Sequence, residues 1–269
     1  MSFSVLLSVY AKEQPDYFNQ AFLSIWDQQI LKPDQIVLVK DGPLTAELDA
    51  EIQRWQEKLG EVLTVVELPE NVGLGAALNE GLKACRHELI ARMDTDDISL
   101  PLRFEKQVAF MQTHHDVTAS SAGLEEWNEN LSLCTGKRQL PTDPVILAKF
   151  ARKRSPLSHP VSIFRKSDVL AIGGYPSLRK AQDYGLWSLL LTKGYKLANL
   201  SDFLLQMRTG NDLFVRRGAD YLKHELALLH FQKRTGFLQL HEFIINYVMK
   251  ASLRLSPAFV KKIAYRYLR

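Results

Sequence analysis

Short apolar runs alternate with amphipathic stretches through the first 110 residues, and this alternation limits the possible fold more than any other feature. The runs at 4–10, 35–40, 64–68 and 89–93 are short and lack helical spacing. The stretches at 15–26 and 45–59 repeat apolar residues with the helical period, and Pro15 and Thr45 stand where helices begin. Strands joined by crossover helices predict a mostly parallel α/β sheet.

Polar residues follow three of the predicted strands directly. Tyr10 ends the first run, Asp41-Gly42 ends the run at 35–40, and Asp94-Thr95-Asp96-Asp97 ends the run at 89–93. Ligands of open parallel sheets bind beyond the carboxyl ends of the strands. The sequence therefore predicts an acidic ligand site at this edge of the sheet.

The carboxylates of Asp94, Asp96 and Asp97 follow one strand and would repel one another unless a positive charge lies among them. A hard divalent cation, with phosphate oxygens completing its coordination shell, is the usual solution. The alternative from composition alone is a solvated turn, or a set of helix-capping aspartates before the helix expected from Pro101.

The nucleotide side of such a site has three candidates. Asp41 is able to accept a hydrogen bond from a base N–H, although a turn aspartate that bonds its own backbone has the same pattern. Tyr10 is placed to stack on a base. Residues 71–79 form a glycine-rich turn that would lie under the nucleotide, with Asn71 as a polar contact. This turn lacks the third glycine of the dinucleotide fingerprint and follows the third strand, so a nicotinamide or flavin role is disfavoured.

The second half of the chain has weaker patterns. Residues 117–153 look irregular, 161–164 look like a strand, and a glycine-rich turn follows at 173–176. A helix is predicted from Asp183 to the glycine at 194, and another over 218–234. Asp183 is either a helix cap or a general base, and spacing does not decide between them.

The net charge of +4 comes from the end of the chain, where six basic residues after residue 237 face a single acidic residue, Glu242. The stretches 240–251 and 259–268 are amphipathic and suit an anionic membrane interface. Packing on the rest of the protein, or in a dimer, would use the same apolar faces.

No nucleic-acid partner is expected, because the remaining chain is close to neutral. No signal peptide or membrane-spanning helix is expected either, and two cysteines without a ligand pattern suit a reducing cytosol.

Six segments in a fixed order resemble glycosyltransferase family 2, the inverting enzymes with the GT-A fold: 4–10, 39–42, 71–79, 93–103, 173–175 and 182–187. This fold is a Rossmann-like, mixed and mostly parallel sheet flanked by helices. The resemblance implies a catalytic domain over 1–215 and a basic, amphipathic helical extension over 216–269. Gln182 departs from the family, which often has an acidic residue before the base.

The resemblance also implies roles for single residues. Asp41 would hold a uracil ring, with Tyr10 and Asn71 beside the nucleotide. Asp94 and Asp96 would contact the ribose and the metal-bound diphosphate, and Mn²⁺ or Mg²⁺ would bind Asp96 and Asp97. Asp183 would deprotonate the acceptor hydroxyl. Further contacts to donor or acceptor are expected from Arg103, His159, Gln182, Trp187 and Arg208.

Within the family the chain looks most similar to bacterial enzymes that build O-antigen or exopolysaccharide. That implies transfer of a hexose, glucose or galactose, from a UDP-sugar to a polyprenyl-diphosphate-linked sugar at the cytoplasmic face of the inner membrane. A non-catalytic carbohydrate-binding protein on the same scaffold is the alternative. A nucleotidyltransferase would require a glycine-rich, basic loop after the first strand, and residues 10–14 contain no glycine.

Overall fold

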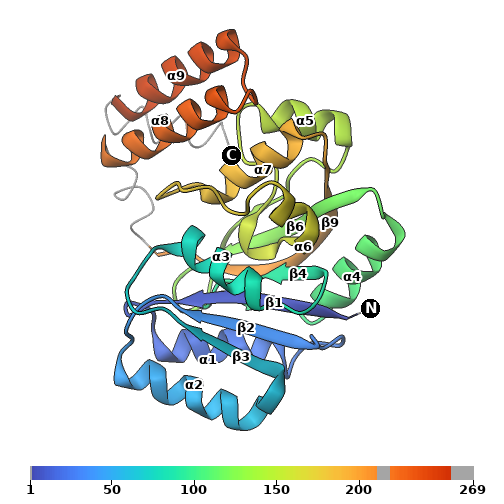
Figure 1. Cartoon of the computed structure of the whole chain (residues 1–269), viewed down its shortest axis with the longest axis vertical. Helices are drawn as coiled ribbons and strands as arrows, with labels where there is room; N and C mark the ends of the chain where they lie inside the picture. Colours follow the sequence, from blue (N-terminus) through green and yellow to red (C-terminus); the bar gives the residue numbers. More distant parts are fainter. Residues whose placement is uncertain (1, 211–218, 256–269) are drawn as a thin grey trace.

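The protein is described from a computed structural model in which residues 2–210 and 219–255 are described. Within these residues one mixed sheet has the strand order β3-β2-β1-β4-β8-β6-β9-β5, and β7 pairs with β6 (Figure 1). The strands are β1 Phe3–Val9, β2 Gln35–Lys40, β3 Leu63–Glu67, β4 Leu89–Arg92, β5 Ile98–Ser99, β6 Val117–Trp127, β7 Cys134–Arg138, β8 Ile163–Arg165 and β9 Lys196–Arg208.

The first seven helices lie in the connections between these strands, and the last two follow β9. They are α1 Pro15–Ile25, α2 Ala46–Leu59, α3 Leu74–Ala84, α4 Arg103–Thr113, α5 Pro144–Ala151, α6 Lys166–Ala171, α7 Gln182–Thr192, α8 Ala219–Arg234 and α9 Leu240–Leu255, with short 3₁₀ turns at Gly60–Val62 and His159–Val161. Helices α1 and α2 cover one face of the parallel strands and α3 covers the other (Figure 1).

The predicted parallel half of the sheet is confirmed. Strands β2 and β4 both pair with β1 in parallel, and β3 pairs with β2 in parallel. Alternate residues of β1 enter two different cores: Val5 and Leu7 join the cluster under α1 and α2, whereas Leu6 joins the cluster under α3. Both faces of β1 are therefore buried, which explains its unbroken apolar sequence.

The expectation of an irregular segment over residues 117–153 is wrong. Strand β6 occupies 11 of these residues and lies between β8 and β9, antiparallel to the first and parallel to the second. Its small polar residues, such as Ser120 and Ser121, are fully buried, so the strand lacks the apolar run that marks the others. Strand β9, with 13 residues, was not predicted either.

Helices α8 and α9 form a hairpin that lies over α5 and α7 (Figure 1). Leu228, Leu229, Phe237 and Leu238 of this hairpin are buried in one cluster with Tyr184 of α7. Part of the predicted extension therefore packs on the rest of the protein. The domain boundary predicted at 215 and the amphipathic stretch 259–268 lie outside the described residues.

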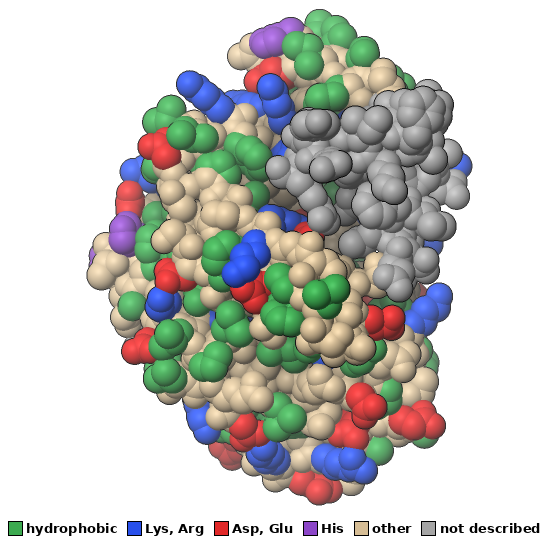
Figure 2. Space-filling view, turned by 180° about the vertical axis from the view of Figure 1, so that it is seen from behind, with side chains coloured by type: hydrophobic (Ala, Val, Ile, Leu, Met, Phe, Trp, Pro, Cys, Tyr) green, Lys and Arg blue, Asp and Glu red, His purple; other side chains and the backbone are tan. Residues whose placement is uncertain are grey.

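One face of α9 has no such partner among the described residues. Leu240, Ile244, Ile245 and Val248 are each at least half exposed, and apolar side chains show at this end of the molecule in Figure 2. Among the described helices, none combines the length and the apolar character that crossing a membrane requires.

Candidate functional site

Loops from the ends of four strands meet at one edge of the sheet. Asp41 follows β2, the acidic residues 94–97 follow β4, and Glu13 lies in the loop after β1. Strand β9 joins them at its end, because the backbone N–H of Arg208 donates to Oδ1 of Asp97 at 2.9 Å. The edge predicted from the strand ends is thus the place where the acidic residues gather.

Asp41 is 4% exposed and holds the glycine-rich turn in place. Its Oδ1 accepts from the N–H of Val72 at 2.7 Å, and its Oδ2 accepts from Gly73 N and Asn71 Nδ2, each at 3.1 Å. Gly42 has φ +85°, and a Cβ there would lie 2.7 Å from the backbone N of Asn71. The two predicted nucleotide residues, Asp41 and Asn71, therefore contact each other directly. Tyr10, at the end of the neighbouring strand, is 40% exposed.

The carboxylates of Asp94, Asp96 and Asp97 repel one another, and burial of Asp96 and Asp97 makes their negative charge unfavourable. Burial, and then the charge of Asp94, raises the pKa of Asp96 to about 6. Burial, and then Asp96 and Asp94, raises the pKa of Asp97 well above its usual range. Asp97 is 1% exposed, and its Oδ2 has no hydrogen-bond partner among the described residues. These carboxylates need a positive charge to be ionised together.

Arg92 supplies part of that charge, and the sequence analysis missed it. Its side chain is fully buried, and Nη2 donates to Oδ1 of the half-buried Asp94. Its Nε and Nη1 have no hydrogen-bond partner among the described residues. An arginine at the end of an otherwise apolar buried strand was the available signal, because arginine is rarely buried without a partner.

Glu13 is a second residue that was missed. Burial raises its pKa to about 7, with further contributions from the charges of Asp96 and Asp94. Its position just after the carboxyl end of the first strand was the signal. The sheet edge where the acidic residues gather therefore has a further carboxylate, which comes from the loop between β1 and α1.

These residues fit only part of the shell of a divalent cation. In the part of the chain that the structure describes, no three His, Cys, Asp or Glu side chains form a metal-holding group. Asp96 and Asp97 are two hard oxygen donors whose charge a cation would neutralise. The other positions would be left to phosphate oxygens and water.

Asp183 lies in the first turn of α7, which begins after Ala181 in the left-handed region at φ +58°. Burial raises the pKa of Asp183, and the charge of Asp94 contributes to the increase. The charges of Asp183 and Asp94 therefore interact within the protein. Gln182, 7% exposed, lies against the start of α3, where a Cβ on Gly75 would be 3.2 Å from its Cγ.

A hydrogen-bonded chain connects α3 to His159 through Tyr175, which lies in the loop before α7. Asn79 of α3 accepts from Tyr175 N at 2.8 Å and donates to Tyr175 O at 2.9 Å. The Tyr175 hydroxyl is 2.9 Å from Nε2 of His159, which is 8% exposed. Burial, and then the charge of Arg92, lowers the pKa of His159 well below its usual range, so this imidazole is neutral. His159 therefore supports the turn before α7.

Arg103 and Trp187, which were predicted to contact the donor or the acceptor, have no exposed surface in this structure. Arg103 donates to the backbone oxygen of Arg92 and to Oε1 of Gln107, the latter at 3.0 Å. Trp187 packs in the core under α3 and α7, since most of α7 is buried.

Arg208 is half-buried beside the acidic residues. Its guanidinium lies 4.3 Å from the centre of the Tyr17 ring, and Nη2 donates to Oε1 of Gln20 at 2.5 Å. These contacts with α1 fix a positive charge at the site edge, and Asp96 and Asp97 interact with it electrostatically.

The model of the family described as "Glycosyl transferase family 2" matches residues 4–161 of the chain. The chain is 40% identical to the amylovoran biosynthesis glycosyltransferase AmsE of Erwinia amylovora, over 98% of this chain and 97% of the relative. It is 34% identical to the UDP-Gal:α-D-GlcNAc-diphosphoundecaprenol β-1,3-galactosyltransferase of Escherichia coli, over 98% and 95% of the two chains.

The fold is also similar to solved structures. The mannosyltransferase PcManGT from Pyrobaculum calidifontis, in complex with GDP-Man and Mn²⁺, superposes with a TM-score of 0.65 at 15% identity. The match covers 99% of this chain and 80% of that one. At this identity the comparison establishes the GT-A fold.

Proposed function

The chain belongs to glycosyltransferase family 2, and from that premise we propose that it transfers a hexose from a UDP-sugar to a lipid-diphosphate-linked sugar, with inversion at the anomeric carbon. The E. coli relative is named for this donor and for a diphosphoundecaprenol acceptor, which supports the substrate classes. The names of both relatives support glycan synthesis as the setting, and glucose or galactose is the proposed sugar.

The nucleotide would be held by the turn that Asp41 organises. The Val72 and Gly73 amides both donate to Asp41, so this carboxylate fixes the turn. Each carboxylate oxygen accepts more than one hydrogen bond, so Asp41 keeps the capacity to accept from a uracil N–H. Tyr10, exposed at the end of β1, is the proposed stacking partner.

The diphosphate would lie at the acidic residues after β4. We assign Asp96 and Asp97 as the ligands of a divalent cation, Mn²⁺ or Mg²⁺, and Asp94 as the ribose contact. Such an ion, when bound, neutralises charge on the departing nucleoside diphosphate. The buried Arg92 forms an ion pair with Asp94, and Arg208 adds a positive charge that interacts with Asp96. The two arginine side chains would stabilise the negative charge that develops on the departing diphosphate.

Asp183 is the proposed general base. Its position at the amino end of α7 favours the ionised carboxylate, whereas burial raises its pKa and makes it a stronger base than an exposed aspartate. It would take the proton of the acceptor hydroxyl while the hydroxyl oxygen attacks the anomeric carbon. One displacement then breaks the bond to the diphosphate and inverts the configuration.

The observation that carries this proposal is the gathering of carboxylates beyond the carboxyl ends of β1, β2 and β4, at one edge of the sheet. The test incubates purified protein with Mn²⁺, an acetamido-sugar diphosphate-lipid analogue and a panel of UDP-, GDP- and dTDP-sugars. Release of UDP from one donor is expected, with losses of about 10²-fold or more in Asp96→Ala and Asp183→Ala. If the protein bound a nucleotide-sugar donor but released no nucleoside diphosphate with this acceptor, a carbohydrate-binding protein would be indicated instead.

We further propose that the exposed face of α9 contacts an anionic membrane, where a lipid-linked acceptor resides. Ile244 and Val248 are 50% and 56% exposed, one turn apart. The variant Ile244→Glu/Val248→Glu should reduce sedimentation with anionic phospholipid vesicles. Val145→Glu/Ile146→Glu on α5, which changes two residues of similar exposure, is the matched control and should not. Equal sedimentation of both variants would contradict the membrane contact.

A further inference from the structure

Asn79 joins two segments that have different tasks in the proposed reaction. It lies on α3, the helix that begins directly after the turn organised by Asp41. Its side chain contacts Tyr175, which lies in the loop that leads from α6 to α7 and so to Asp183. The reaction described above gives Asn79 no role of its own.

The carboxamide of Asn79 binds the backbone of Tyr175 twice. Its Oδ1 accepts from the Tyr175 N–H at 2.8 Å, and its Nδ2 donates to the Tyr175 oxygen at 2.9 Å. A neighbouring β-strand would pair with Tyr175 in the same way, and here one side chain supplies both hydrogen bonds. A Cβ on Gly174 would clash with Asn79 Oδ1, so the loop lies directly against the amide.

The residue after Tyr175, Pro176, packs between two helices. A Cβ on Gly75 of α3 would lie 3.7 Å from the Pro176 oxygen, and a Cβ on Gly185 of α7 would lie 2.7 Å from its Cγ. Gly75 and Asn79 are four residues apart and so lie on the same face of α3. This face therefore meets the loop at two places, and the loop in turn meets α7.

The same face of α3 also reaches the residue next to the base. Gln182 is 7% exposed, and a Cβ on Gly75 would lie 3.2 Å from its Cγ. Asp183 follows in the first turn of α7, which begins after Ala181 at φ +58°. A residue other than glycine is strained in this region and keeps its conformation where the surrounding contacts hold it. The contacts of α3 with the loop and with Gln182 supply such restraint.

We propose that Asn79 is a positioning residue of the transfer reaction, which holds Asp183 in place relative to the donor by fixing the loop before α7. The proposal rests on the proposed function, because Asn79 would act through the general base assigned there. A purely structural role of this amide predicts a loss of stability alone. A positioning role predicts a slower chemical step as well, since a displacement of about 1 Å costs on the order of 10²-fold in rate.

The test compares the full-length wild type with Asn79→Asp, which keeps an acceptor for the Tyr175 N–H but has no donor for the Tyr175 oxygen. With a UDP-sugar and the acetamido-sugar diphosphate-lipid analogue, kcat should fall about tenfold or more, whereas the KM for the UDP-sugar and the affinity for UDP should stay within about twofold. An unchanged kcat, or a UDP affinity that falls as much as kcat, would overturn the proposal. If Asn79→Asp did not fold, Asn79→Ser, which is neutral and too short for both hydrogen bonds, carries the same prediction.

A double-mutant cycle with Asp183→Ala separates positioning from a general loss of structure. Adding Asn79→Asp to Asp183→Ala should change the residual kcat by less than about twofold, because the group through which Asn79 acts is then absent. A further fall by the same factor as in wild type would show that Asn79 acts independently of the base, and would overturn the proposal.

The matched control is Asn246→Asp. Asn246 is 3% exposed, and its Nδ2 also donates to a backbone oxygen, that of Arg152, at 2.8 Å. The substitution removes the same kind of hydrogen bond from the contact between α9 and α5, and should lower the melting temperature while kcat stays within about twofold. A fall in kcat as large as that of Asn79→Asp would assign both effects to lost stability and overturn the proposal.

Hydrogen exchange separates a failure of this proposal from a failure of the proposed function, because it requires no turnover. If the wild type released no nucleoside diphosphate from any donor, the proposed function would fail. The backbone amides of residues 174–186 should still exchange about tenfold faster or more in Asn79→Asp than in wild type or Asn246→Asp. Equal exchange in Asn79→Asp and wild type would refute the restraint on which the positioning depends.

Discussion

At the scale of single residues, the site is a group of side chains whose charges depend on one another. Asp94, Asp96, Asp97 and Glu13 are brought together with the buried guanidinium of Arg92. Burial and mutual repulsion raise the pKa values of Glu13 and Asp96, so in metal-free protein near neutral pH some of these carboxyls are protonated. Both the stability of the protein and its affinity for a cation should therefore depend on pH.

Glu13→Gln tests the repulsion. The folded-state pKa of Glu13 is about 7, above the ordinary 4.5, so its protonated form stabilises the fold below pH 4.5 and this stability is lost as the pH rises through 7. The variant should therefore melt at a higher temperature than metal-free wild type at pH 8, and show little gain at pH 5. Differential scanning calorimetry at both pH values measures this. A gain of the same size at both would show that charge is not the cause.

Asp96 makes a prediction for the metal. Its pKa of about 6 in metal-free protein means that a proton competes with a cation below that pH. We expect Mn²⁺ to bind, in the presence of UDP, more weakly at pH 5.5 than at pH 7.5, and to release protons when it binds near pH 6. Calorimetry in buffers of different ionisation enthalpy detects both effects. Affinity that did not change between the two pH values would argue against Asp96 as a ligand.

The acidic residues after β4, Asp41 and Asp183 could be predicted because strand ends and helix starts are visible in the sequence. Glu13 and Arg92 were missed although their positions at strand ends were visible, since their importance comes from contacts with charges distant in sequence or from burial. The burial of Arg103 and Trp187 was not visible in the sequence for a related reason. A polar or aromatic residue near a motif has the same pattern whether its side chain points to a ligand or into the core.

At the scale of elements, the turn between β2 and α2 has a strict geometric requirement. Gly42 has φ +85°, and a Cβ there would lie 2.7 Å from the backbone of Asn71. Gly42→Ala should lower the free energy of unfolding by about 1–3 kcal/mol and weaken UDP binding, because the 71–73 turn must move. Thermal melting and UDP calorimetry measure the two effects.

Gly60→Ala is the matched control for that substitution. Gly60 also has a positive φ, +53°, but a Cβ there would meet nothing within 4 Å. It should lose stability through backbone strain alone and bind UDP as wild type does. If both variants bound UDP equally, the contact between Gly42 and the turn would not matter for the donor.

The elements that the sequence predicted are those with strong patterns. Strands β1, β2 and β4 are apolar because both of their faces are buried. Helix α2 has a visible cap, since Thr45 Oγ1 accepts from Leu48 N at 3.3 Å. Strand β6 lacked such a pattern because buried serines replace apolar residues. Ser121, for example, donates to the side chain of Asn199 in β9. Pairing between β6 and β9 therefore depends on polar contacts that single-chain periodicity does not reveal.

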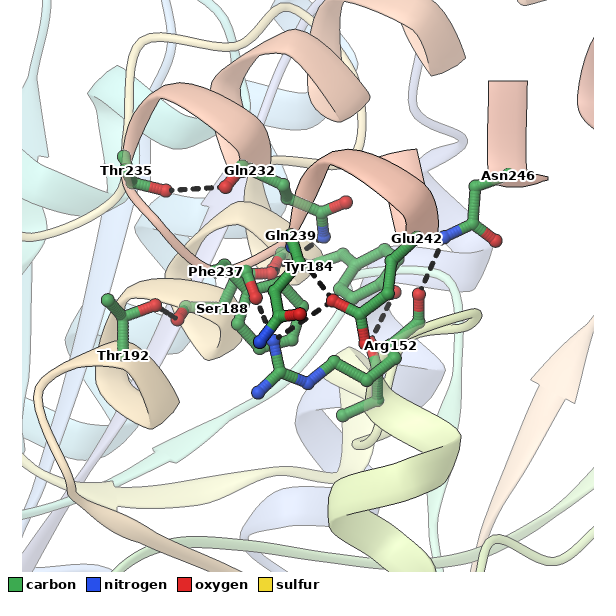
Figure 3. A network of polar contacts seen from close by, with 11 residues as sticks. Arg152, Tyr184, Ser188, Thr192, Gln232, Thr235, Phe237, Gln239, Glu242 and Asn246 are labelled. Atoms are coloured by element: carbon green, nitrogen blue, oxygen red, sulfur yellow. Dashed lines mark hydrogen bonds and ion pairs between the residues drawn. The ribbon is translucent and has the colours of Figure 1, made fainter. Parts of the chain in front are cut away.

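At the scale of the whole molecule, the α8–α9 hairpin is part of the folded unit. Figure 3 shows the polar contacts that join it to α5 and α7: Gln232 Nε2 donates to Ser188 Oγ at 2.7 Å, and Asn246 Nδ2 donates to Arg152 O at 2.8 Å. Arg152 also donates to the backbone oxygen of Phe237 and lies 3.6 Å from Glu242. The hairpin is thus fixed to α7, the helix that carries the proposed base in its first turn.

Leu238→Asp tests this integration, with Leu240→Asp as its matched control. Leu238 is 1% exposed and Leu240 is 60% exposed, two residues apart. Burying a carboxylate at 238 should lower the free energy of unfolding by about 3 kcal/mol in a single transition, whereas the change at 240 should have little effect. Circular dichroism melts measure both. Two separate transitions in Leu238→Asp would show that the hairpin is an independent unit.

The hydrogen bond between Asp97 and the backbone of Arg208 joins residues 111 positions apart. A ribosome synthesises the acidic segment long before it synthesises β9. Strand β9 takes its place in the sheet beside β6 only after that. The nascent chain therefore holds its cluster of aspartates without one of their anchoring donors until nearly four-fifths of the protein has been made. The order of synthesis would therefore keep an unfinished chain from forming the complete site proposed for the UDP-sugar.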